Sequence, residues 1–231
     1  DADALRACVS ERGGLEALSA ERVHSELMRL LCAAGAAGAL RKMFEYGLLV
    51  QLLAGVPFLG RLENLIAIEA ELGTEPDPVL RLAALAIAVV EDTVRLTQRL
   101  RLSNAERKRL EQVSDYRAIA VDMDDAAVRA KLYAVGRPGC RECALIAWAA
   151  SRDTVTDNDW RGLMLRIQEM SVPEFPLQGA DILQMGVPRG PAVGEILGET
   201  ETRWIAGDFA MTRAELLEIA RGLAATSSGK T

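Results

Sequence analysis

The sequence predicts an all-α fold, an irregular multi-helix array of about a dozen helices, because apolar residues recur with helical spacing in nearly every segment. Half of the residues are hydrophobic but only 4% are aromatic. Such a composition, rich in Ala and Leu, favours close helix packing over a β-sandwich. No segment alternates between apolar and polar residues as a half-buried strand would, and no fixed period recurs, so we expect neither a sheet nor a solenoid.

Helix starts are marked by residues whose side chains can cap the first turn. Four hydroxyl residues precede helical runs: Ser19, Ser103, Thr156 and Thr212. Their oxygens can accept a hydrogen bond from an otherwise unpaired backbone N–H group. Glu106 and Glu215 follow two of them at a distance of three residues, the spacing of a capping box. The last helix then has one apolar stripe, made of Leu216, Ile219, Ala220 and Leu223.

Clusters of Gly, Pro and Asp separate the helices. They lie at residues 13–14, 55–60, 73–78, 122–125, 136–139, 171–176 and 185–191. The clearest domain boundary falls near 113–125, with a second one near 171–176. We therefore expect one helical domain over residues 1–120 and another over 121–231.

Charge and hydropathy limit the function. The net charge of −6 gives no overall attraction to nucleic acid or to an anionic membrane surface. The longest apolar run, 82–90, is about half as long as a bilayer span requires. The N-terminal residues lack the basic start and apolar run of a signal peptide, so we expect no membrane association and a cytoplasmic location.

Candidate catalytic and metal-binding residues are few. His24 is the only histidine and lies beside an apolar helical stripe, where a packing role is expected. Cys140 and Cys143 form a single C-x-x-C pair, whereas a structural zinc site usually has two. Asp122 and Asp124 have the D-x-D spacing of a Mg²⁺ site, but they precede a helix that Asp124 can cap. We expect no catalytic residue and no metal ligand.

Two stretches are locally basic. Residues 95–109 contain six Lys or Arg and one Glu, and residues 129–141 contain four Lys or Arg and no acid. Clusters of this kind neutralise phosphates in nucleic-acid complexes. The candidates for phosphate contacts are Arg107, Lys108, Lys131 and Arg137. The alternative is an ordinary solvated helix face.

The stretch MGVPRGPAVGEIL, residues 185–197, contains three glycines and two prolines. It predicts the end of one helix, a tight turn, and a new helix that begins at Pro191, since Pro is well tolerated at the first helical position. Backbone N–H groups at such a corner can bind an anion, and Arg189 adds a cation. The alternative is a tight turn that serves only close helix packing at Gly194.

The order of these motifs resembles a known family. The pieces LSAERVHSELMRLL, LRKMFEYGLL, LRLSNAERKRL and PLQGADILQMGVPRGPAVGEILGETETRWIAGDF are similar to the class II branch of the bacterial CCA-adding tRNA nucleotidyltransferases and poly(A) polymerases. The first piece resembles the last conserved motif of the family, at its neck. The final piece resembles the glycine-rich corner of its RNA-facing tail.

This resemblance implies an all-α neck and body over 1–120 and a tail over 121–231 that hold tRNA or another RNA. The catalytic head of the family, with its paired aspartates, Mg²⁺ and nucleotide triphosphates, has no counterpart in this sequence. We therefore expect a C-terminal portion that is inactive without a head domain. The choice between CCA addition and polyadenylation depends on that head. The alternative is a helical protein–protein interaction scaffold that does not bind RNA.

The resemblance also assigns residues. Glu21, Arg22 and Glu26 match the neck motif and are expected to bind the head domain. Gly186, Arg189 and Gly190 match the tail corner and are expected to contact RNA.

Overall fold

The structure is a computed structural model, and it describes residues 13–14 and 18–228. The described part contains twelve α-helices and a short 3-10 helix, and none of its residues forms a strand. The predicted all-α fold is confirmed. The described residues divide into two compact units, one formed by those up to 123 together with 137–169 and the other by 124–136 together with 170–228.

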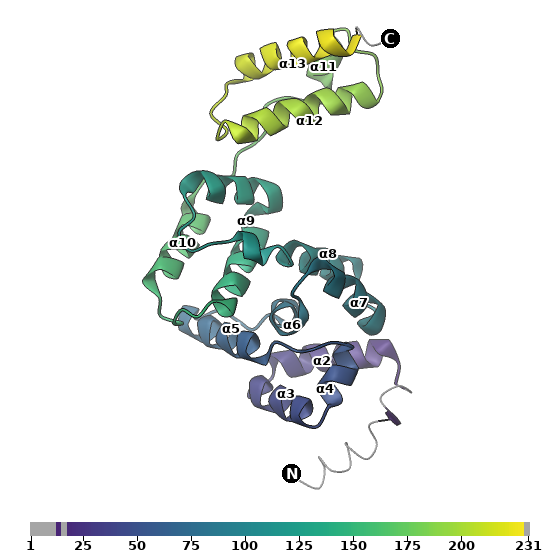
Figure 1. Cartoon of the computed structure of the whole chain (residues 1–231), viewed down its shortest axis with the longest axis vertical. Helices are drawn as coiled ribbons and strands as arrows, with labels where there is room; N and C mark the ends of the chain where they lie inside the picture. Colours follow the sequence, from purple (N-terminus) through teal and green to yellow (C-terminus); the bar gives the residue numbers. More distant parts are fainter. Residues whose placement is uncertain (1–12, 15–17, 229–231) are drawn as a thin grey trace. The chain divides into compact units, whose positions relative to one another are not determined.

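The first unit is built around helix α6 (Pro78–Ala86), whose residues from Leu80 to Ala86 are all buried. Figure 1 shows it among its neighbours, and it packs against α2, α5 and α8. The surrounding helices are α2 (Ala20–Cys32), α3 (Ala36–Glu45), α4 (Leu48–Leu53), α5 (Leu59–Leu72), α7 (Val90–Leu100), α8 (Asn104–Val113), α10 (Asn158–Glu169), the second half of α9 (Asp125–Ala150) and the 3-10 helix η2 (Tyr116–Ala118).

Two buried arginines tie α6 to its neighbours. Arg81 pairs with Glu69 of α5 (Nη2–Oε2, 2.6 Å) and donates to the carbonyl of Leu31 at the end of α2 (2.7 Å). Arg61 of α5 donates to carbonyls at the C-terminal end of α6. Burial raises the pKa of Glu69, although its hydrogen bond to Arg81 opposes that shift. A buried charge requires such partners, so these contacts fix the relative positions of α2, α5 and α6.

The second unit contains α11 (Gly179–Gln184), α12 (Pro191–Ala206), α13 (Arg213–Ser228) and the first half of α9. Helices α12 and α13 lie side by side (Figure 1). Its core includes Trp204, with Phe209 at 4.9 Å and Tyr133 at 5.6 Å between ring centroids. The predicted stripe of the last helix faces this core, with Leu216 and Ala220 fully buried.

The observed units differ from the expected division at 120/121. Residues 137–169 join the first unit, because α9 is broken at Gly136, where φ is 71° and ψ is 167°. That backbone conformation is open to glycine and strained for other residues. The second expected boundary, near 171–176, lies close to the transition at 169/170.

The predicted helix caps were largely correct. Ser19 accepts from the N–H of Arg22, and Ser103 with Glu106 forms a capping box. Thr212 and Glu215 exchange the two bonds of a second box. The prediction for Thr156 was wrong. Helix α10 begins one residue later, because the Asp157 carboxylate accepts the N–H groups of Asp159 (2.9 Å) and Trp160 (3.1 Å).

Candidate functional site

The glycine-rich corner joins α11 to α12 as the sequence predicted. Met185 and Gly186 close α11 through their N–H groups, and Gly186 has a φ of 87°. Pro191 occupies the first turn of α12. Gly190 is the N-cap residue and has no side chain that could accept the first N–H groups of α12. Pro191 has no N–H group and the Val193 N–H donates to the Gly190 carbonyl (3.2 Å), so the Ala192 N–H and the helix dipole are what this helix start can offer to an anion.

The packing explanation for this corner can be tested at Gly194. A Cβ atom built there meets no atom within 4 Å, and Gly194 is exposed. Close helix packing therefore does not require glycine at this position. Arg189 is also exposed and lies in the turn next to Gly190. The arrangement favours the anion-binding interpretation over the packing interpretation.

Two polar pockets lie beside the corner, between the end of α11 and helix α13. They measure about 330 and about 260 Å³ and share Met185 and Arg221. Their remaining lining residues are Asp181, Gln184, Arg213, Leu217, Gly186, Val187, Ala224 and Ala225. Arg213 and Arg221 were not among the residues predicted from the sequence. Their spacing with Leu217, four residues apart each time, places all three on one face of α13 and could have indicated them.

Half of the basic residues in the stretch 95–109 are bonded inside the first unit. Arg99 donates to the carbonyls of Gln51 and Leu52 at the end of α4. Arg109 bonds Asp77 and Glu142, and Arg95 bonds Asp92. Three of its six basic residues remain exposed: Arg101, Arg107 and Lys108.

Among these, Arg107 forms an ion pair with Glu111 of the same helix, 2.5 Å apart. Lys108 is exposed on α8. The stretch therefore presents a smaller positive surface than its composition suggests.

In the second basic stretch, residues 129–141, more of the cations are buried or bonded within the fold. The side chain of Lys131 is buried, with 9% of its surface exposed. Arg137 donates to the carbonyls of Ile167 and Gln168 at the end of α10. Arg129 holds Asp208 through two bonds. Because Lys131 is buried and Arg137 is bonded to the end of α10, we leave both out of the candidate RNA surface.

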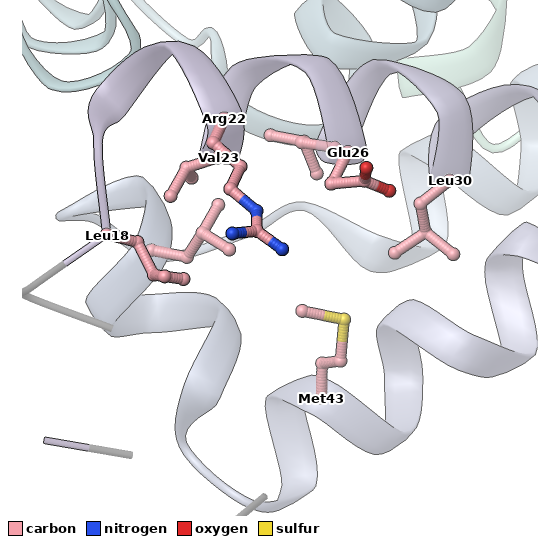
Figure 2. A pocket seen from close by; sticks show the side chains of 8 residues that line it. Leu18, Arg22, Val23, Glu26, Leu30 and Met43 are labelled. Atoms are coloured by element: carbon pink, nitrogen blue, oxygen red, sulfur yellow. The ribbon is translucent and has the colours of Figure 1, made fainter. Parts of the chain in front are cut away.

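The neck motif lies on α2, beside an apolar pocket of about 300 Å³ in the first unit. We call this pocket the neck socket. It is lined by Leu18, Arg22, Val23, Glu26, Leu27, Leu30, Met43 and Leu52. Figure 2 shows Arg22, Glu26 and Leu30 extending from α2 towards Met43 of α3. Arg22 and Glu26 thus place two opposite charges at a largely apolar cavity, whereas Glu21 is exposed on α2 and does not line it.

His24 has a structural partner. Its Nε2 lies 3.0 Å from the Glu106 carboxylate, so it connects α2 to α8. Burial raises the pKa of Glu106, but hydrogen bonds from Ser103 and the proximity of His24 outweigh it and leave that pKa lowered. This geometry agrees with the packing role expected for His24.

The remaining candidates also have structural roles. Asp124 accepts the N–H of Ala127 (2.8 Å), as predicted for a helix cap. Cys140 and Cys143 are buried thiols, while Cys8 lies outside the described residues. Residues 13–14 and 18–228 hold no group of three His, Cys, Asp or Glu side chains placed to bind a metal ion. None of the helices described there has both the length and the apolarity of a membrane span.

The chain is similar to known proteins, both in its N-terminal part and over nearly its whole length. Residues 1–59 match the family described as "Probable RNA and SrmB- binding site of polymerase A". The chain is 25% identical over 225 residues to "CCA tRNA nucleotidyltransferase 1, mitochondrial" of Mus musculus and of Homo sapiens, which covers 94% of this chain and 49% of each relative. The Danio rerio protein of the same name is 27% identical over 216 residues, or 93% and 49% of the two chains. The chain thus spans about half the length of these relatives.

Proposed function

Because the chain is related to the family of CCA-adding enzymes and poly(A) polymerases, we propose that it is the RNA-binding portion of a nucleotidyltransferase that extends RNA 3′ ends. The resemblance expected from the sequence is confirmed at the level of this family relationship. The observation that carries the RNA-binding proposal is the corner at Gly186–Gly190. There the uncapped start of α12 and the exposed Arg189 lie next to each other.

This corner is suited to phosphate rather than to base recognition. Backbone N–H groups and an arginine bind phosphate oxygens, which are the same in every RNA sequence. Tail contacts of this kind position a folded RNA by its shape and backbone. We propose tRNA, or another RNA whose 3′ end is extended, as the ligand.

We propose that the catalytic chemistry belongs to a head domain of the parent protein. Asp122 and Asp124 do not fit a Mg²⁺ site, because Asp124 caps α9 and no cluster of three ligands occurs among the described residues. We expect this chain to add no nucleotide by itself. Mg²⁺ and nucleotide triphosphates would bind to the head, and whether it adds CCA or poly(A) would be determined there.

The neck socket is the site that we assign to the head domain. Its walls are mainly leucine and methionine side chains, with Arg22 and Glu26 at its edge. An apolar side chain of the head would fill the cavity, and polar groups beside it would pair with Arg22 and Glu26. Glu21, exposed on the same helix, would lie at the rim of this contact.

A titration of a labelled tRNA transcript with the purified chain tests the RNA-binding proposal. We expect affinity to fall steeply between about 50 and about 200 mM salt, as counterion release requires. Arg189→Glu should weaken binding at every salt concentration. The matched control is Arg203→Glu on α12, since Arg203 is exposed and pairs with Glu199 away from the corner. Unchanged affinity in Arg189→Glu, or equal losses in both variants, would remove the corner from the RNA surface.

A second function is a protein-interaction scaffold without RNA binding. Large apolar side chains are exposed on and beside α3 and α4: Phe44, Tyr46, Val50, Val56 and Phe58. This surface favours a protein partner for the first unit. Absence of tRNA binding at low salt would select this alternative. A cytoplasmic location remains part of the proposal, to be checked by fractionation of cells that express the parent protein.

A further inference from the structure

The groove formed by the two pockets beside the corner has the chemistry of an RNA backbone site. We call it the α13 groove, defined by Asp181, Gln184, Met185, Gly186, Val187, Arg213, Leu217, Arg221, Ala224 and Ala225. We propose that it binds the phosphodiester backbone of the RNA segment next to the corner, with Arg221 between two neighbouring phosphates. The inference rests on the proposed function and extends it to a surface and to residues that the sequence analysis did not identify.

The charge of the groove favours an anion. Its lining contains two arginines and one carboxylate. The carboxylate, Asp181, is already engaged, since it accepts the N–H of Gln178 (2.8 Å) and pairs with Arg213 (2.5 Å). Arg221 is the cation that lines both pockets, so an anion in either one lies beside it.

Arg221 can leave its present partner at little cost. It pairs with Glu218 three residues earlier on α13, and the two side chains are 57% and 73% exposed. Exposed pairs of this kind contribute little stability and are screened by salt. A phosphate in the groove can therefore replace Glu218, because arginine binds phosphate with two parallel hydrogen bonds.

The apolar parts of the groove fit the sugars of the same backbone. Met185 and Leu217 line the first pocket, and Val187 with the two alanines lines the second. These surfaces can contact ribose, whereas no aromatic side chain for base stacking is found among the described residues that line them. We therefore expect binding that is independent of RNA sequence.

The experiment compares two substitutions in the groove with two controls on α12. Arg221→Glu reverses the shared charge, and Ala225→Glu places a carboxylate in the second pocket at an exposed helix position. Arg203→Glu and Ala206→Glu make the same changes at exposed positions that line neither pocket. All four are made in the full chain, and far-UV circular dichroism verifies that each folds.

The probes are a tRNA transcript and an unstructured RNA oligonucleotide, each titrated over a series of salt concentrations. We expect Arg221→Glu to weaken tRNA binding roughly tenfold at low salt and to reduce the salt slope by about 1. Ala225→Glu should also weaken binding, and both controls should stay within about twofold of the wild type, as expected for side chains that contact no phosphate. A loss with tRNA alone would assign the groove to folded RNA, and a loss with both probes to any RNA backbone.

The outcomes separate this inference from the proposed function. If Arg189→Glu weakens binding but Arg221→Glu and Ala225→Glu behave like their controls, the groove is not an RNA site and the proposed function stands. If the wild-type chain binds neither RNA at low salt, both proposals are wrong.

Discussion

Replacement of Arg61 by methionine should lower the free energy of unfolding of the first unit by more than a surface substitution does. The guanidinium of Arg61 is buried and donates to the carbonyls of Ala84 (2.6 Å), Ala83 (3.1 Å) and Ile87 and to the Tyr116 hydroxyl (2.9 Å). Burial lowers its pKa, and Tyr116 partly opposes that effect. Methionine has a similar length, so it removes the hydrogen bonds without opening a large cavity.

The size of the effect follows from the carbonyls that lose a donor. Ala83 keeps one bond, since it also accepts the N–H of Ile87. Ala84 does not regain a helical partner, because the N–H of Ala88 donates to Asp92 instead. The carbonyls of Ala84 and Ile87 are then buried without a donor, which costs about 1–3 kcal/mol each. Adding the loss of the charge contact over the Phe58 ring at 4.4 Å, and subtracting the desolvation of a buried charge, we expect about 3–5 kcal/mol.

Urea unfolding measures this difference. Because the two units can unfold separately, the assay uses tryptophan fluorescence in a Trp204→Phe background, in which Trp148 and Trp160 report on the first unit. The control is Arg41→Met, which removes an exposed ion pair with Glu63 and should cost less than about 1 kcal/mol. Equal stabilities for the two variants would show that the carbonyls at the end of α6 find other partners.

Three further predictions concern the corner and the titrating groups. Gly186→Ala should destabilise the second unit by about 1–2 kcal/mol because of its φ of 87°, whereas Gly194→Ala, where a Cβ meets open space, should be neutral or stabilise α12 by up to about 1 kcal/mol in thermal unfolding. Burial raises the pKa of Asp77, but hydrogen bonds from Arg109 and backbone N–H groups prevail and lower it. Its stabilising effect is therefore complete above its unfolded pKa and is lost as pH falls through the folded value, and Asp77→Asn should flatten the acid limb of a stability–pH curve. Burial and Glu201 raise the pKa of Tyr133 to about 12, so its stabilising contribution is complete below about pH 10, the pKa of an unfolded tyrosine, and is lost as pH rises through about 12. Near-ultraviolet titration should therefore show a tyrosine that ionises near pH 12, and Tyr133→Phe should remove it.

Local signals in the sequence predicted the helices well. Capping boxes at Ser103 and Thr212 depend on residues three positions apart, which a sequence displays directly. The error at Thr156 has the same local cause, since Asp157 is an equally good cap and the sequence does not rank the two. Helical periodicity gives no sign of the break in α9, because both of its halves are helical and only the conformation of Gly136 separates them.

The candidate site was less predictable, because the local number of charged residues does not show which partners the fold brings from distant positions. Arg109 lies in the most basic stretch of the chain, yet its charge is neutralised by Asp77 and Glu142, each more than thirty positions away. Arg137 donates to the last carbonyls of α10, a helix that begins twenty-one residues after it. Conversely, no basic cluster in the sequence indicates Arg221. It is a candidate only because α11 packs against α13 and forms two pockets that Arg221 lines.

The net charge of −6 therefore says little about RNA binding. At physiological ionic strength a charge is screened beyond about 8 Å, so a phosphate at the corner responds to the nearby arginines rather than to the whole chain. Both Arg189 and Arg221 are exposed, and neither is bonded to a side chain of another helix. The basic stretches show the opposite behaviour, since most of their cations serve the fold. An acidic protein can thus have a phosphate-binding surface where a few exposed arginines are not bonded to other helices, and such arginines are identified by their contacts and not by the local density of charge.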